Sequence, residues 1–96
     1  MIPVIRVGDG CTVWKFPFRI TDRQELSWPS GGEVLHVGLD AVGQPCLWVL
    51  VDPSETFVKH TLAVVGTGNP MSEGLYGHLG SFVSAPFAWH VFEEYE

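Results

Sequence analysis

This 96-residue chain has few cations, few cysteines and no long apolar run, and each shortage excludes a class of protein. Its five Lys and Arg residues stand against eleven Asp and Glu residues, which gives a formal net charge of −6. Neutralising the phosphates of DNA or RNA requires a basic stripe, so the composition argues against direct nucleic-acid binding. No apolar run reaches the ~20 residues that a membrane helix needs, and Met1–Val4 lacks the basic start of a signal peptide. We therefore predict a cytoplasmic protein with no membrane partner.

Long helical periods are also missing. Eleven glycines and seven prolines are spread along the chain, a distribution typical of a β meander. Because 46% of the residues are apolar and only 17% are charged, the chain has the composition of a folded protein. We predict one all-β domain over residues 1–96, a small antiparallel barrel or sandwich of six to seven short strands. Residues 1–11 would form a leading strand or arm, residues 12–93 the β core, and residues 94–96 an acidic tail.

The predicted centre of the fold is Pro45–Pro53. Six consecutive apolar residues follow Pro45, and an Asp-Pro turn ends the run, so both faces of this strand are expected to be covered. Thr56–Gly66 begins amphipathic and ends apolar, which makes it a second central candidate. Further strands are expected at Thr12–Phe16, Glu25–Trp28, Glu33–Leu39, Leu79–Val83 and Phe87–Phe92, with at most one helical turn, at Met71–His78.

Glu33–Leu39 has an alternating pattern that places Leu35, Val37 and Leu39 on one buried face. A glycine-containing loop of hairpin length joins it to the central strand, so the two are expected to be antiparallel neighbours.

Four tryptophans are many for a chain of this length. Trp48 and Trp89 are expected to lie in the core, where large aromatic faces are usually buried. Trp28 stands beside the loop Pro29–Gly32 and is the tryptophan expected to be exposed. An exposed aromatic at a loop mouth anchors a protein partner or stacks on a base.

No motif indicates catalysis or metal binding. His36, His60, His78 and His90 are far apart in the sequence and form no zinc-like pair with another ligand. The acidic residues at turns suit backbone hydrogen bonding, and no serine lies in a Gly-x-Ser-x-Gly elbow. We predict no enzyme activity, cofactor or metal; the alternative is an enzyme built on strands that bring His36, His60 and His90 together.

The candidate partner-binding residues lie in loops and at the C-terminal end. Gly66–Pro70 lacks the Gly-Lys-Ser/Thr of a phosphate loop and is interpreted as a structural turn that borders a binding surface. The acidic end is interpreted as solvated, with an alternative role in meeting a basic patch on a target. The full set of candidates is Trp28, Arg19, Arg23, Gly66, Gly68, Asn69, Glu93 and Glu94.

Several runs together resemble a family of short phage and prophage proteins of unknown function. They are Trp14–Phe18, Thr21–Gln24, Cys46–Pro53, Gly66–Pro70 and Trp89–Glu93. The resemblance covers nearly the whole chain from Val13 onward, and Met1–Gly10 is longer than the usual start. It implies a protein of the host bacterial cytoplasm that acts by stoichiometric binding, often against bacterial defence, and it supplies no catalytic residue.

We therefore expect a phage-encoded accessory protein that inhibits a host defence system, as an anti-CRISPR or similar counter-defence protein does. Its loops and acidic rim would occupy a basic site on a host defence protein. The alternatives are a sponge for a small signalling nucleotide, with Trp28 stacking and Arg19 or Arg23 holding phosphate, and a structural or interaction protein of a phage. Homo-oligomers through exposed strand edges are a further expectation.

Overall fold

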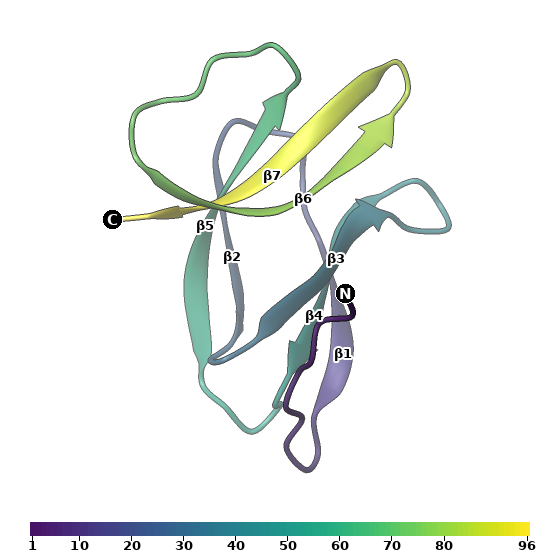
Figure 1. Ribbon diagram of the computed structural model, residues 1–96, viewed down its shortest axis with the longest axis vertical. Coiled ribbons are helices and arrows are strands. Elements are labelled where there is room, and N and C mark those ends of the chain that lie inside the picture. The colour runs from purple at the N-terminus through teal and green to yellow at the C-terminus, as the bar shows by residue number, and fades with distance from the viewer.

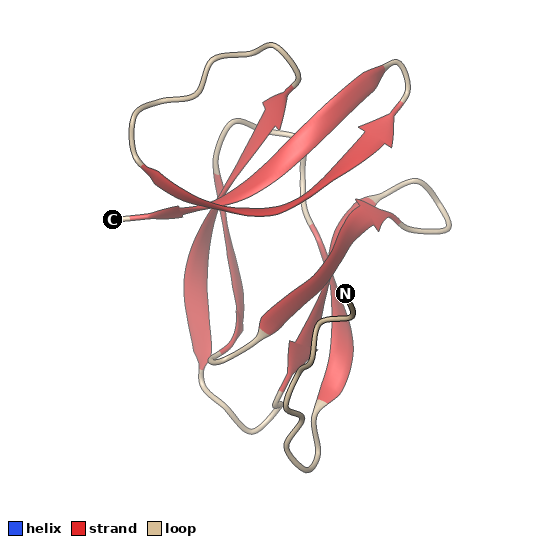
Figure 2. Ribbon diagram, in the orientation of Figure 1, coloured by secondary structure: helices blue, strands red, loops and turns tan.

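The computed structural model describes all 96 residues, and it contains seven β-strands and no helix (Figure 2). The strands are β1 (Thr12–Pro17), β2 (Gln24–Pro29), β3 (Glu33–Leu39), β4 (Pro45–Val51), β5 (Phe57–Gly66), β6 (Leu75–Ser84) and β7 (Phe87–Tyr95). The predicted all-β fold is confirmed. No helical turn forms within Met71–His78, because β6 has already begun at Leu75. The structure contains no helix that is long and apolar enough to cross a bilayer.

Two antiparallel sheets form a sandwich-like fold, and they meet where β3 contacts β6 (Figure 1). The first sheet has the order β1-β4-β3, and the second has the order β2-β5-β7-β6. The chain crosses between them after β1, after β2 and after β4. Buried side chains from both sheets form one apolar core, which includes Leu47, Leu62 and Val91.

β4 is the central strand of its sheet, as predicted, but only one of its faces is covered by the other sheet. Leu47, Val49 and Val51 point into the core and are at most 1% exposed. On the opposite face, Trp48 and Leu50 are only half-buried. The prediction of cover on two sides is therefore wrong, because no third layer lies over this outer face.

β3 pairs with β4 in antiparallel fashion, as predicted, yet one of the three residues predicted to face inward, Leu35, does not do so. A β-bulge between Val34 and His36 shifts the register, so that Val34 packs against the core. Leu35 is the extra residue at the bulge and is 43% exposed. Val37 is buried as predicted, and Leu39, which shares the face of Val37, is 37% exposed at the end of the strand. One extra residue in a strand reverses the faces of the residues on its two sides.

The expected positions of two tryptophans are reversed. Trp28 was the residue expected to be exposed, but it is 2% exposed and lies in the core. β2 continues pairing with β5 as far as Pro29, so Trp28 lies inside a strand instead of at a loop mouth. Trp48 packs against His36 on the outer face of its sheet, with the two ring centroids 5.4 Å apart. Trp89 is half-buried and packs against the core.

β5 is the central strand that positions the site described below. It pairs with β2 over Phe57–Leu62 and with β7 over Thr61–Gly66, which confirms the prediction of a second central strand. The two pairings cover different halves of this ten-residue strand.

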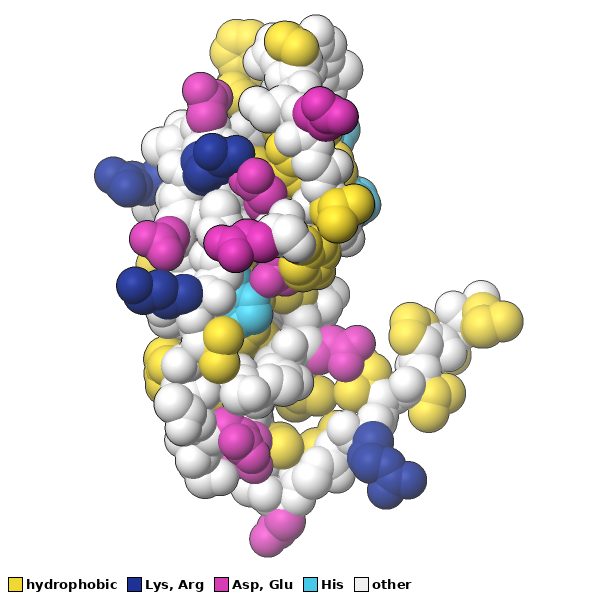
Figure 3. Space-filling view, turned by 90° about the vertical axis from the view of Figure 1, so that its left-hand side faces the viewer, with side chains coloured by type: hydrophobic (Ala, Val, Ile, Leu, Met, Phe, Trp, Pro, Cys, Tyr) yellow, Lys and Arg dark blue, Asp and Glu magenta, His cyan; other side chains and the backbone are white.

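The two ends of the chain differ. Residues 1–11 form an arm without strand pairing, and Figure 3 shows it extending away from the body. β7 continues to Tyr95, so Glu93 and Glu94 belong to a strand instead of a free tail.

Candidate functional site

A groove runs along the half of β5 that lacks a neighbour on one side. The pairing with β2 ends at Gln24 opposite Leu62, so from Ala63 to Gly66 the strand pairs with β7 alone. A cavity of about 260 Å³ lies along this stretch. We call it the β5 groove, and its lining residues are Asp22, Arg23, Ala63, Val64, Val65, Gly66, Asn69, Pro70, Met71, Ser72, Tyr76 and Trp89.

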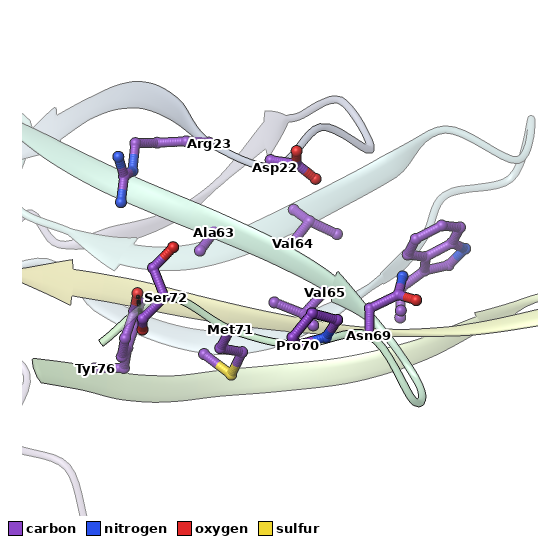
Figure 4. A pocket seen from close by; sticks show the side chains of 12 residues that line it. Asp22, Arg23, Ala63, Val64, Val65, Asn69, Pro70, Met71, Ser72 and Tyr76 are labelled. Carbon is purple, nitrogen blue, oxygen red and sulfur yellow. Dashed lines mark hydrogen bonds between the residues drawn. The ribbon is translucent and has the colours of Figure 1, made fainter. Parts of the chain in front are cut away.

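Two segments form the walls of the β5 groove. Figure 4 shows Asp22 and Arg23 on one side of the β5 ribbon and Pro70, Met71 and Ser72 on the other. The walls therefore combine a charged segment with a mostly uncharged one.

A buried glutamine holds the charged wall in place. Gln24 is 9% exposed, and its Oε1 accepts a hydrogen bond from the backbone N–H of Arg19 at 3.0 Å. Its Nε2 donates to the Arg19 carbonyl and to the Thr21 hydroxyl. These bonds close the turn that presents Asp22 and Arg23.

Arg23 also forms an ion pair with Glu94 on β7. The guanidinium Nη2 lies 2.6 Å from the Glu94 Oε1 atom, and 57% of the Arg23 side chain remains exposed. The Glu94 side chain is only 23% exposed and its Oε1 atom is buried without a hydrogen bond, so loss of Arg23 would leave a buried carboxylate oxygen without its cation. Arg23 therefore stays paired with Glu94, and its exposed part is what a ligand can contact.

The opposite wall begins with a tight turn after β5. Gly68 has a φ of +89°, and the Asn69 backbone N–H donates to the Gly66 carbonyl at 3.0 Å. A Cβ atom at Gly66 would come within 2.9 Å of the Asn69 side chain and 3.2 Å of the Trp89 ring. The sequence therefore needs glycine at both positions to bring the loop back beside the strand.

The candidate residues divide between the β5 groove and other places. Arg23, Gly66 and Asn69 line the groove. Gly68 lies in the turn beside it, and Glu94 pairs with Arg23. The backbone N–H and C=O groups of Arg19 form hydrogen bonds with the Gln24 side chain, and Arg19 is exposed to solvent.

Trp28 and Glu93 lie elsewhere, and each is engaged within the domain. The Trp28 ring stacks on His60, with centroids 3.7 Å apart and planes 8° apart. His60 Nδ1 lies 2.5 Å from the Glu93 Oε2 atom, and both side chains are mostly buried. Glu93 is therefore not a solvated acid available to a basic target.

The histidines occupy separate places. His36 packs on Trp48 in the first sheet, whereas His60 faces inward from the second sheet. His90 bonds to the Ser81 hydroxyl at 2.8 Å and to the Thr67 hydroxyl at 2.7 Å. No group of three or more His, Cys, Asp or Glu side chains is arranged to hold a metal ion. The convergence of His36, His60 and His90 required by the enzyme alternative does not occur.

Residues of the uncharged wall were missed by the sequence reasoning, chiefly Met71, Ser72 and Tyr76. The sequence does contain one relevant signal, which is the difference in length between β2 and β5. A six-residue strand cannot pair along the whole of a ten-residue neighbour, so part of the longer strand has to lack a partner on that side.

Comparisons with known proteins give two similarities. No solved structure matches the chain. The chain is 44% identical over 54 residues to "Proteasome subunit alpha type-5" of Drosophila melanogaster. That stretch is 56% of this chain and 20% of the fruit-fly protein, so the chain spans about a fifth of that relative's length. Residues 10–96 match a family described as "Domain of unknown function (DUF7352)". Because the match covers nearly the whole chain, the protein belongs to this family.

Proposed function

We propose that this domain is a non-catalytic binding module that captures an extended segment of a partner protein in the β5 groove. The observation that supports the proposal is the pairing of Ala63–Gly66 with β7 on one side and with no strand on the other. An open strand edge carries backbone N–H and C=O groups that pair readily with another chain. Many peptide-binding domains capture their ligand by adding it as a strand to such an edge.

The dimensions and charges of the groove define the segment it would take. A volume of about 260 Å³ holds only a few residues, so the captured segment is short. Arg23 stands at one wall with 57% of its side chain exposed, so its guanidinium can bind an acidic group of the segment while it stays paired with Glu94. We therefore expect the ligand to be an extended peptide that has small or apolar side chains and one acidic residue.

The resemblance to short phage proteins suggests the setting. We propose that the partner is a host defence protein, for example a component of a CRISPR system, and that the domain acts by sequestering it in the bacterial cytoplasm. Stoichiometric binding agrees with a site that has an open strand edge and no arrangement of catalytic groups.

The test is a binding measurement with purified defence proteins from bacteria that carry this gene. We expect a complex of near one-to-one stoichiometry, and we expect Ser72→Trp to reduce its affinity at least tenfold by filling the groove. Val42→Trp is the matched control, since Val42 is 87% exposed in the β3–β4 turn, away from β5. Binding of Ser72→Trp at wild-type affinity would rule out the groove as the contact.

In the alternative function, a sponge for a signalling nucleotide, Trp28 is the residue that would stack on the base. Trp28 already stacks on His60 inside the domain, so a base cannot reach its face without unpacking the core. In a thermal-shift panel of signalling nucleotides we expect no rise in the melting temperature, because only a ligand of the native state stabilises it. A saturable rise with one nucleotide would favour the sponge over the peptide module.

A further inference from the structure

The outer face of the β1-β4-β3 sheet carries an apolar surface that no layer covers. Trp48 and Leu50 are half-buried there, and Val13, directly opposite Leu50, is 46% exposed. A strand with apolar residues on both faces is typical of a sheet buried on both sides. The sequence of β4 has this pattern, whereas the isolated chain covers only its inner face.

The N-terminal arm is the second apolar element without a partner. Ile2, Val4 and Val7 are 86%, 98% and 59% exposed. Figure 3 shows hydrophobic side chains along the arm, which projects away from the body. Single exposed apolar residues are ordinary in soluble proteins, but contiguous ones mark a surface that contacts another molecule.

We propose that a second copy of this chain covers the outer face, and that each copy lays its arm across the outer face of the other. One chain carries both the uncovered outer face and an apolar arm. In a dimer, the arm of each copy would therefore cover the outer face of the other copy. Such a contact is isologous and closes as a dimer.

Charge also favours this occupant. Residues 1–8 of the arm contain Arg6 and no acid, and Asp9 follows in the turn at the base of the arm. Glu33 lies opposite Leu50 in the β3–β4 pairing, so an acid stands on the face that would receive Arg6. Lys15, opposite Trp48, is a cation on the same face, but it is already paired with Asp40 at 3.0 Å. Complementary charge of this kind orients the two partners and raises the rate of association.

The dimer contact and the β5 groove belong to different sheets. The two therefore do not compete, and the dimer would present two grooves. The inference stands on its own, because it uses no residue that lines the groove.

The experiment is a mass measurement by light scattering and sedimentation across micromolar concentrations of the 96-residue chain. We expect a species of twice 10.6 kDa at the upper concentrations. Val13→Glu on the face and the double change Ile2→Glu with Val4→Glu on the arm should each give a mass of 10.6 kDa. Val42→Glu, which adds a charge at a position that is 87% exposed in the β3–β4 turn, should leave the dimer intact.

Two results would overturn the proposal. One is a wild-type chain that stays monomeric over the whole concentration range. The other is a dimer that persists in both the face variant and the arm variant, since it would then use another surface. The arm variant keeps the experiment decisive even if Val13→Glu fails to fold, because the arm forms no strand and contributes no side chain to the core.

Discussion

Gly80 on β6 lies so close to Val37 on β3 that a Cβ atom at position 80 would come within 2.8 Å of the valine side chain. The two residues belong to different sheets, and Val37 is a member of the core. A bulge between His78 and Gly80 adjusts the register of β6 just before this contact. The absence of a side chain at position 80 therefore sets how closely the sheets approach.

Gly80→Ala should lower the free energy of unfolding by about 1–3 kcal/mol, because an inserted methyl group overpacks the core. Urea unfolding followed by fluorescence measures the change. Gly74→Ala is the matched control, since a Cβ there meets Tyr76 at an ordinary 3.4 Å. Equal stabilities of the two variants would mean that the sheets separate easily at this point.

Trp28→Ala should be among the most damaging single substitutions in the chain. The side chain is 2% exposed and stacks on His60, and truncating a buried aromatic costs about 3–5 kcal/mol. Phe87→Ala is the comparison, because Phe87 is 60% exposed near the β6–β7 turn and should lose far less. Thermal unfolding of both variants checks the order, and a larger loss in Phe87→Ala would contradict the assignment of the core.

Asp40 makes the β3–β4 turn sensitive to acid. Its Oδ1 accepts hydrogen bonds from the backbone N–H groups of Gln44 and Val42, and its Oδ2 pairs with Lys15 at 3.0 Å. The bond from Gln44, together with the one from Lys15, holds the pKa of Asp40 below its ordinary value of 3.8. A carboxylate whose pKa is lower in the folded state stabilises that state above the unfolded value, and the contribution is lost as the pH falls through the folded pKa.

Wild type should therefore be more stable than Asp40→Asn at pH 7, and the difference should shrink as the pH falls below 3.8. Urea midpoints for both proteins between pH 7 and pH 2 provide the measurement. Asp9→Asn serves as the control, because the Asp9 carboxylate lies before β1 and makes no hydrogen bond or ion pair within the chain. A difference between wild type and Asp40→Asn that is constant with pH would exclude this role for Asp40.

Gln24→Ala should release the turn that forms the charged wall of the β5 groove. It removes the bonds to Arg19 and Thr21, and a buried backbone group left without its partner costs about 1–3 kcal/mol. We expect lower stability together with changed backbone chemical shifts at Asp22 and Arg23. Gln24→Glu keeps the acceptor for the Arg19 N–H but places a buried carboxylate oxygen against the Arg19 carbonyl, so it should also lose stability at pH 7. Unchanged shifts in both variants would mean that the turn holds without Gln24.

The strand pattern was predictable because it depends on local chemistry. Pro45–Val51 is apolar between two turns, and that alone is enough to identify a central strand. Its uncovered outer face was not predictable, because cover depends on how many layers the fold contains. The bulge beside Leu35 was not predictable either, since one inserted residue leaves the alternation of the sequence unchanged.

The part of the candidate site that depends on local residue types was also predictable. Gly66 and Asn69 mark a tight turn by their residue types, and the structure places both at the β5 groove. The prediction that Trp28 is exposed was wrong. The Pro-Ser-Gly-Gly sequence after Trp28 indicates a loop, but it does not show where the strand pairing ends. That end is fixed by β5, a strand almost thirty positions later in the chain.

The three crossings of the chain between the two sheets have a consequence for folding. Neither sheet is made of one continuous segment, so neither can form before distant parts of the chain meet. Closing such loops costs conformational entropy before the stabilising contacts between distant strands have formed. Sandwiches built from non-local strand pairs therefore fold slowly, in about milliseconds to seconds. We expect a single slow cooperative transition, in which a fragment ending after β4 would lack every neighbour of β2 and would not fold on its own.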